Sequence, residues 1–275
     1  MLLMNGSRSI HEKETRVSEI PPAIPERFLP ACRCIRRLEQ EERYLAAFIF
    51  GSLARGEATS HSDVDVNVIV TADNPCSNIN HPIIQGVKLD LTFLSFDQLR
   101  ARTNQEIAQR ERMPILAESL IVFDKTNELL QLQARARQVK PKAILPAEYQ
   151  FLQFMFFHGN DKVERNLETD PITALFVMHV GLDELLKYHC RLQQKWWVSS
   201  KRLLADLRDW DAPLAQLIEH FIATCEVRTK FHYWSAIIDH ILEPIGGRQP
   251  IAENNCDCAV CQRDLSMIRD EPGIR

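Results

Sequence analysis

The chain has 275 residues, 45% apolar and 25% charged, a balance that supports a packed core and excludes wholesale disorder. Its net charge of −4 argues against nucleic acid as a partner, because nucleic-acid-binding domains are usually basic. Apolar runs such as 45–50 fall far short of the roughly 20 residues of a membrane helix, and the sequence after Met1 lacks the apolar core of a signal peptide. We therefore expect a cytoplasmic protein without a membrane partner, whose eight cysteines are mostly reduced.

The first half of the chain predicts a mixed sheet with helices. Apolar residues recur at helical spacing from Glu26 to Glu42. Two later segments alternate apolar and polar residues with a period of two, which is typical of strands that bury one face. In chain order, the predicted elements are a loose arm over 1–25, a helix over 26–42, strands over 45–50, 63–70 and 87–93, a helix over 96–109, a strand over 120–123 and a helix over 127–139.

Pro141 and Pro146 mark the next boundary, because prolines punctuate secondary structure. After them the strand pattern disappears, and apolar stripes at helical spacing replace it, as with Leu175, Met178 and Leu182. The predicted helices cover 147–168, 172–194, 199–208, 212–225 and 228–243. We expect an α+β chain with an N-terminal arm (1–25), a mixed sheet-and-helix domain (26–140), an all-α helical domain (146–245) and a polar, Cys-containing tail (246–275).

One stretch, from Phe48 to Val66, carries residues suited to chemistry. Gly51-Ser52 directly follows the predicted buried strand and is expected to open a short helix. Glycine lets the backbone approach a ligand closely, and a helix start offers unpaired N–H groups to a phosphate. Taken alone, such a pair is more often a plain turn.

Three aspartates follow on strands. Asp63 and Asp65 stand two apart on the valine-rich strand, so both point away from the valines. Carboxylates so placed can converge on magnesium, which is held by carboxylates and substrate phosphates. A solvated strand face is the alternative, but Asp is disfavoured in strands, so two of them need a reason. Asp90 lies on the polar face of the next alternating strand and joins the pair if the two strands are neighbours in register.

Together, Gly51-Ser52, a spacer of ten residues, Asp63-Val-Asp65 and the later Asp90 resemble the DNA polymerase beta-like nucleotidyltransferase superfamily. The match is especially close to its bacterial small-molecule (aminoglycoside-type) and minimal branches, and it covers roughly residues 26–140. The resemblance implies a nucleotidyltransferase fold there, a mixed β-sheet flanked by helices. It also implies that Gly51 and Ser52 hold the triphosphate, and that Asp63, Asp65 and Asp90 are catalytic and bind two magnesium ions.

The resemblance predicts transfer of a nucleoside monophosphate, AMP from ATP, to a hydroxyl of a small-molecule acceptor such as an antibiotic, by two-metal catalysis. The helical second domain favours a small-molecule acceptor. Adenylylation of a protein partner, or a non-catalytic nucleotide-binding regulator on the same fold, are the alternatives. Asp90 is a candidate general base, with Asp183 or Glu184 as alternatives.

The charge of such a site calls for additional cations. Two magnesium ions bring about +4, three aspartates about −3 and a nucleoside triphosphate about −4, which leaves the site near −3. Arg55 is the local candidate to offset this charge by contacting the nucleotide. Lys195 and Lys201 are candidates from the helical domain, with a solvated helix face as their alternative.

The tail contains Cys256, Cys258 and Cys261, spaced as Cys-x-Cys-x2-Cys. Thiolates this close can bind zinc, although no fourth ligand is evident. Cys32 and Cys34 form a second close pair. Unliganded thiols are the alternative to a zinc site.

Overall fold

The computed structural model describes residues 24–249, 258–260 and 263. The chain divides into two compact units. The first contains the residues up to Ala108 together with Pro114–Val139, and the second contains Gln109–Met113 and the residues from Lys140 on. Most of the predicted arm (1–25) and of the predicted tail (246–275) lies outside the described residues.

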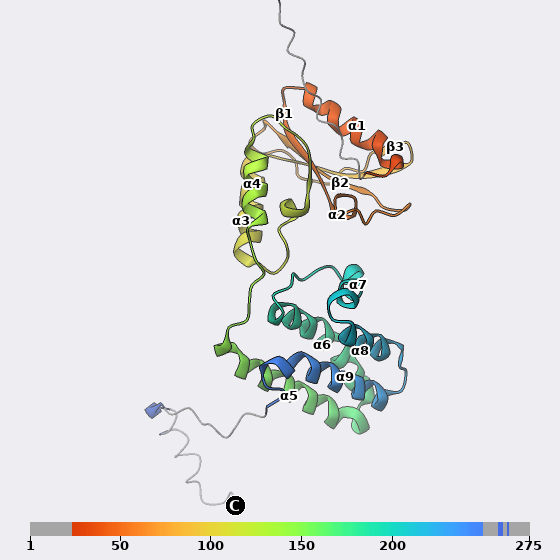
Figure 1. The fold of residues 1–275 in the computed structure, drawn as a ribbon, viewed down its shortest axis with the longest axis vertical. Coiled ribbons are helices and arrows are strands. Elements are labelled where there is room, and N and C mark those ends of the chain that lie inside the picture. Colours follow the sequence, from red (N-terminus) through yellow and green to blue (C-terminus); the bar gives the residue numbers. More distant parts are fainter. Residues whose placement is uncertain (1–23, 250–257, 261–262, 264–275) are drawn as a thin grey trace, which may run out of the picture. The chain divides into compact units, whose positions relative to one another are not determined.

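A mixed sheet forms the centre of the first unit (Figure 1). Its strands, within the described residues, follow the order β3-β4-β2-β1-β5. β2 and β4 run parallel, whereas the other neighbouring strands are antiparallel. The strands are β1 (Tyr44–Phe50), β2 (Val64–Val70), β3 (Ile83–Ile84), β4 (Val87–Leu94) and β5 (Leu120–Asp124).

Helices and 3-10 turns surround this sheet. They are η1 (Glu26–Phe28), α1 (Leu29–Arg37), η2 (Leu38–Gln40), α2 (Gly51–Ala54), α3 (Phe96–Gln109), η3 (Ile115–Glu118) and α4 (Glu128–Arg137). The single helix predicted over 26–42 is thus a shorter α-helix with a 3-10 turn at each end, where 3-10 geometry commonly occurs. The two-residue strand β3 was not predicted, because it is too short to show a period.

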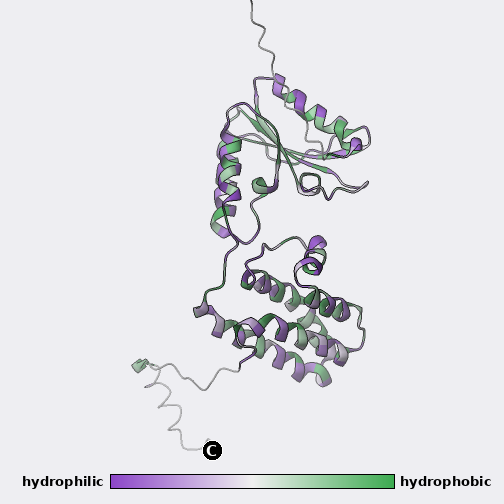
Figure 2. Ribbon diagram, in the orientation of Figure 1, coloured by the Kyte–Doolittle hydropathy of each residue, from purple (hydrophilic) through white to green (hydrophobic). Residues whose placement is uncertain are grey.

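Both faces of β2 are covered. Alternate valines of β2, such as Val66, pack in one core with Phe28 and Ile35 from the α1 side. On the opposite face Asn67 is only 2% exposed and lines a small cavity together with Leu99 of α3. The prediction of a single buried face was therefore wrong, because α3 covers the second one. In Figure 2 the central strands are predominantly hydrophobic, as expected for strands buried on two sides.

The second unit is helical, which confirms the α+β class of the chain. Its helices are α5 (Pro146–Thr169), α6 (Pro171–Leu192), α7 (Ser200–Trp210), α8 (Ala212–Ala223) and α9 (Val227–Leu242), followed by η4 (Glu243–Ile245). Their bounds agree with the predicted helices to within three residues. Asp170 and Asp211 cap α6 and α8 by accepting hydrogen bonds from Thr173 N and Leu214 N, which fixes the breaks between helices.

The core of the second unit is formed by the inward stripes of these helices. Met178, Leu185, Phe221 and Ile237 are fully buried within it. None of the helices in the described ranges is both long enough and apolar enough to cross a membrane.

Candidate active site

The sheet register brings the predicted aspartates together. Asp65 on β2 is the direct partner of Asp90 on β4 in the parallel pair. The two strands are therefore neighbours, and their register is the one on which the predicted grouping of the aspartates depended. Asp63 lies one residue before β2 rather than on it, so it stands at the same end of the strands, where its carboxylate accepts a hydrogen bond from Lys88.

A lysine links two of these carboxylates. The Lys88 Nζ donates to Asp63 Oδ2 at 3.1 Å and lies 3.0 Å from Asp90 Oδ1. His81 Nδ1 lies 2.7 Å from the same Asp90 oxygen. The site thus brings an ammonium and an imidazole together with the carboxylates of Asp63 and Asp90.

The aspartates differ in their pKa values. Burial, together with the negative charges of Asp90 and Asp63, raises the pKa of Asp65 above its ordinary value. Burial also acts to raise the pKa of Asp90, but the hydrogen bonds from Lys88 and His81 outweigh it and leave that pKa lowered. A lower pKa makes a carboxylate a weaker base, and the general-base role of Asp90 stays a prediction.

Gly51 gives space to Asp65. Gly51 has a φ of +74°, and a Cβ atom there would lie 2.0 Å from Asp65 Oδ2. The helix α2 that it opens has four residues, which agrees with the predicted short helix but gives only a small helix dipole, so phosphate binding there would depend on the unpaired N–H groups. Ser52 lies in α2 and is half-buried. Arg55 pairs with Glu57 at 3.0 Å, and its charge also acts on Asp65.

Sequence reasoning missed Lys88 and His81. Lys88 shares the period-two face of Asp90 on β4, and this spacing was the signal that could have identified it. His81 had no such signal. It lies opposite Asp90 because the hairpin pairs Ile83 with Lys88 and Asn80 with Leu91, which only the turn between β3 and β4 decides.

Asp63, Asp65 and Asp90 have the right chemistry for a divalent ion, since carboxylate oxygens are the ligands that magnesium prefers. The pKa of Asp65 is raised first by burial and then by the negative charges of Asp90 and Asp63, and a cation would offset those charges. In the part of the chain that the structure describes, no group of three or more His, Cys, Asp or Glu is arranged to hold an ion as it stands. Lys88 lies between two of the three carboxylates.

The zinc hypothesis is not tested at the tail, because Cys256 and Cys261 lie outside the described residues. At the other close pair, burial raises the pKa of the Cys32 thiol to about 11. A buried thiol with a raised pKa is a poor metal ligand, because zinc binds the thiolate.

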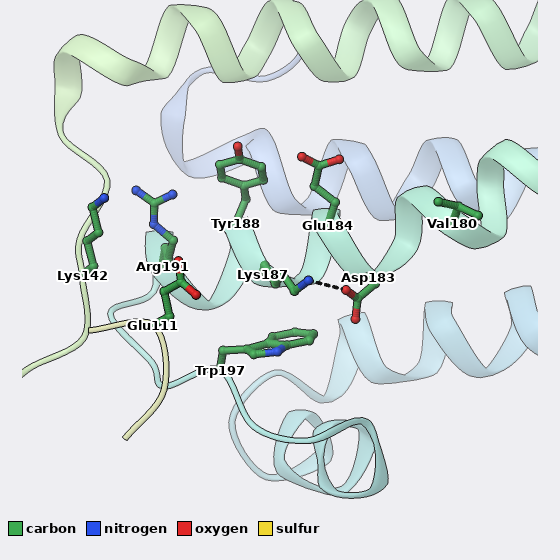
Figure 3. Close-up of a pocket in the computed structure, with 9 residues that line it drawn as sticks. All are labelled: Glu111, Lys142, Val180, Asp183, Glu184, Lys187, Tyr188, Arg191 and Trp197. Carbon is green, nitrogen blue, oxygen red and sulfur yellow. Dashed lines mark ion pairs between the residues drawn. The ribbon is translucent and has the colours of Figure 1, made fainter. Parts of the chain in front are cut away.

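The second unit has a cavity of its own, of about 430 Å³. One face of α6 lines it with Asp183, Glu184, Lys187 and Arg191, and the ring of Trp197 lies on the other side (Figure 3). The Lys187 Nζ is ion-paired with Asp183 at 2.5 Å and lies 5.5 Å from the Trp197 ring centre. The cavity is therefore polar and charged, with an aromatic wall.

A short segment from the first half of the chain helps to build this cavity. Trp197 N donates to Glu111 O at 3.3 Å, and Lys142 N donates to Arg110 O at 3.0 Å. Lys195 and Lys201 lie elsewhere in the same unit. The Lys195 Nζ is 5.7 Å from the Trp210 ring centre, and Lys201 is exposed on α7.

The sequence match decides the identity of the first unit. Residues 33–138 match the family model described as "Polymerase beta, Nucleotidyltransferase". This segment is a polymerase beta-type nucleotidyltransferase domain. The nucleotidyltransferase domain contains Gly51, the three aspartates and Lys88, whereas the helical unit lies beyond the match.

Comparison with solved structures gives a further likeness. A nucleotidyltransferase-like protein from Exiguobacterium sibiricum 255-15 is 14% identical to this chain, with a TM-score of 0.44, over 78% of this chain and 74% of that one. No curated protein matches the chain.

Proposed function

We propose that this chain transfers a nucleoside monophosphate, AMP from ATP, to a hydroxyl of a small-molecule acceptor, and that the reaction needs divalent metal. The observation that carries the proposal is the pairing of Asp65 with Asp90 on adjacent parallel strands, with Asp63 bound to the same lysine as Asp90. This arrangement lies inside a nucleotidyltransferase domain.

In this reaction the acceptor oxygen forms a bond to the α-phosphorus, and the bond from that phosphorus to the β-phosphate oxygen breaks. Pyrophosphate leaves, and the acceptor proton passes to a base. Asp63, Asp65 and Asp90 would hold magnesium, which when bound offsets the phosphate charge and activates the attacking oxygen. Gly51 keeps the Asp65 carboxylate in place by leaving room for it. Arg55, whose charge already acts on Asp65, is the nearest candidate to contact the phosphates.

The cavity of the helical unit supports a small-molecule acceptor. Its volume of about 430 Å³ lies within the range of roughly 300–1,000 Å³ typical of small-molecule sites. Trp197 and Tyr188 provide flat walls, and Glu184 and Arg191 provide polar groups of both signs to orient a ligand. We expect Glu184→Gln to weaken binding of the acceptor to this cavity.

The test is to incubate the chain with ATP labelled at the α-phosphate, magnesium, and a panel of hydroxyl-bearing small molecules, antibiotics and proteins. We expect pyrophosphate release with the label on a small molecule, and loss of both with EDTA. Asp63→Ala and Asp65→Ala should abolish transfer, whereas Asp73→Ala, at an exposed acid of the same unit, should not.

The other outcomes separate the alternatives. Label on a protein would favour adenylylation of a partner, and metal-dependent nucleotide binding without any transfer would favour a regulator. Full turnover by either Asp63→Ala or Asp65→Ala would show that the site is wrongly assigned.

A further inference from the structure

The ammonium of Lys88 lies between two of the three carboxylates expected to hold metal. Its Nζ is 3.1 Å from Asp63 Oδ2 and 3.0 Å from Asp90 Oδ1. It acts on the third carboxylate, Asp65, through its charge. Lys88 is therefore a positive charge that the chain itself brings to the place where a bridging cation would bind.

The main chain sets where the Lys88 backbone lies and which face of β4 its side chain shares. It is the second residue of β4 and pairs with Ile83 of β3, next to a turn in which Gln85 and Gly86 have positive φ values of 49° and 78°. Successive strand residues alternate between faces, so Lys88 and Asp90 share one. The Asp90 carboxylate, which pairs with Lys88, also contacts His81 at 2.7 Å, so two side chains orient it.

An ammonium and a divalent ion compete for this gap. Magnesium binds oxygen at about 2.0–2.1 Å, so an ion shared by Asp63 Oδ2 and Asp90 Oδ1 would occupy the space that Lys88 Nζ fills. Two positive charges at that separation also repel each other strongly. Asp65, which accepts no hydrogen bond from Lys88, and the second oxygens of Asp63 and Asp90 are left for a cation.

We propose that Lys88 replaces one of the two divalent ions implied by the family resemblance, so that the chain binds a single divalent ion together with its nucleotide. The inference rests on the proposed function, because the nucleotide phosphates supply the remaining ligands of that ion. Lys88 is then a positioning residue, which holds Asp63 and Asp90 by a fixed charge in place of a metal.

The experiment counts manganese ions on the full chain. Manganese is titrated into the protein saturated with α,β-methylene-ATP, an analogue that cannot lose pyrophosphate, and free manganese is followed by electron paramagnetic resonance. We expect one ion per complex for the wild type and for Lys88→Arg. Lys88→Met and Lys88→Gln should each bind two. Lys162→Met, at an exposed lysine of α5, removes the same charge elsewhere and should still bind one.

Two ions on the wild type, or one ion on both Lys88→Met and Lys88→Gln, would overturn the inference. If the wild type binds two ions and also transfers labelled AMP, the inference alone fails and the proposed function stands. If no variant binds the analogue in the presence of manganese and no label is transferred, the proposed function fails and the inference falls with it.

Discussion

Replacing Gly51 with alanine should damage the site more than the fold. Gly51 has a φ of +74°, and the added Cβ would lie 2.0 Å from Asp65 Oδ2. The left-handed backbone alone costs an alanine about 1 kcal/mol. The close contact between the new Cβ and Asp65 Oδ2 costs more, because the half-buried Asp65 side chain must move away from its position beside Asp90. On the proposed role of Asp65 as a metal ligand, this displacement should lower metal affinity by about 10- to 100-fold.

Gly56→Ala is the matched control for this prediction. Gly56 has a φ of +75°, but a Cβ there meets nothing within 4 Å. Both variants should lose about 1 kcal/mol or more of unfolding free energy in urea. Only Gly51→Ala should weaken manganese binding in the presence of α,β-methylene-ATP. Equal manganese affinity in both variants would refute the claim that Gly51 exists to make room for Asp65.

The remaining predictions concern stability. The pKa of Asp65 is raised in the folded state, so ionisation of Asp65 destabilises the fold as the pH rises through that pKa. Asp65→Asn should therefore raise the Tm of the metal-free protein at pH 7. A lower Tm would contradict this expectation. Burial lowers the pKa of His189 from 6.5, so the contribution of neutral His189 to stability should be lost as the pH falls below about 6.5. Asp211→Ala should cost about 3 kcal/mol of unfolding free energy in urea. This variant removes the partner of His189 at 2.8 Å and the cap of α8. Gly181→Ala would place a Cβ 2.8 Å from Trp234 Cη2, so it should cost about 1–3 kcal/mol while manganese binding stays unchanged.

Elements with a regular period were predictable from the sequence. The strand over 87–93 and the helix over 96–109 correspond to β4 and α3, because side-chain periodicity is a local property that burial of one face imposes. The breaks of the helical unit were equally local, since a capping aspartate precedes α6 and α8. The strand β3 has only two residues, which are too few to show a side-chain period, so it could not be predicted.

The composition of the site was also largely encoded in sequence. Gly51 and the three aspartates stand at a spacing that identified the superfamily, and residues 33–138 match its model. Metal binding and the roles of these residues remain predictions. The short helix predicted after Gly51 is present as α2, whereas phosphate binding by Gly51 and Ser52 stays a prediction.

Only the tertiary structure decided which charges meet. The sequence by itself determined that Asp65 and Asp90 lie on strands, but strand order and register placed them opposite each other. The same register placed Lys88 between Asp63 and Asp90, and the hairpin returned His81 to the same carboxylate. Electrostatic interactions depend on distance through space, and residues far apart in the chain reach such distances only after the sheet has formed.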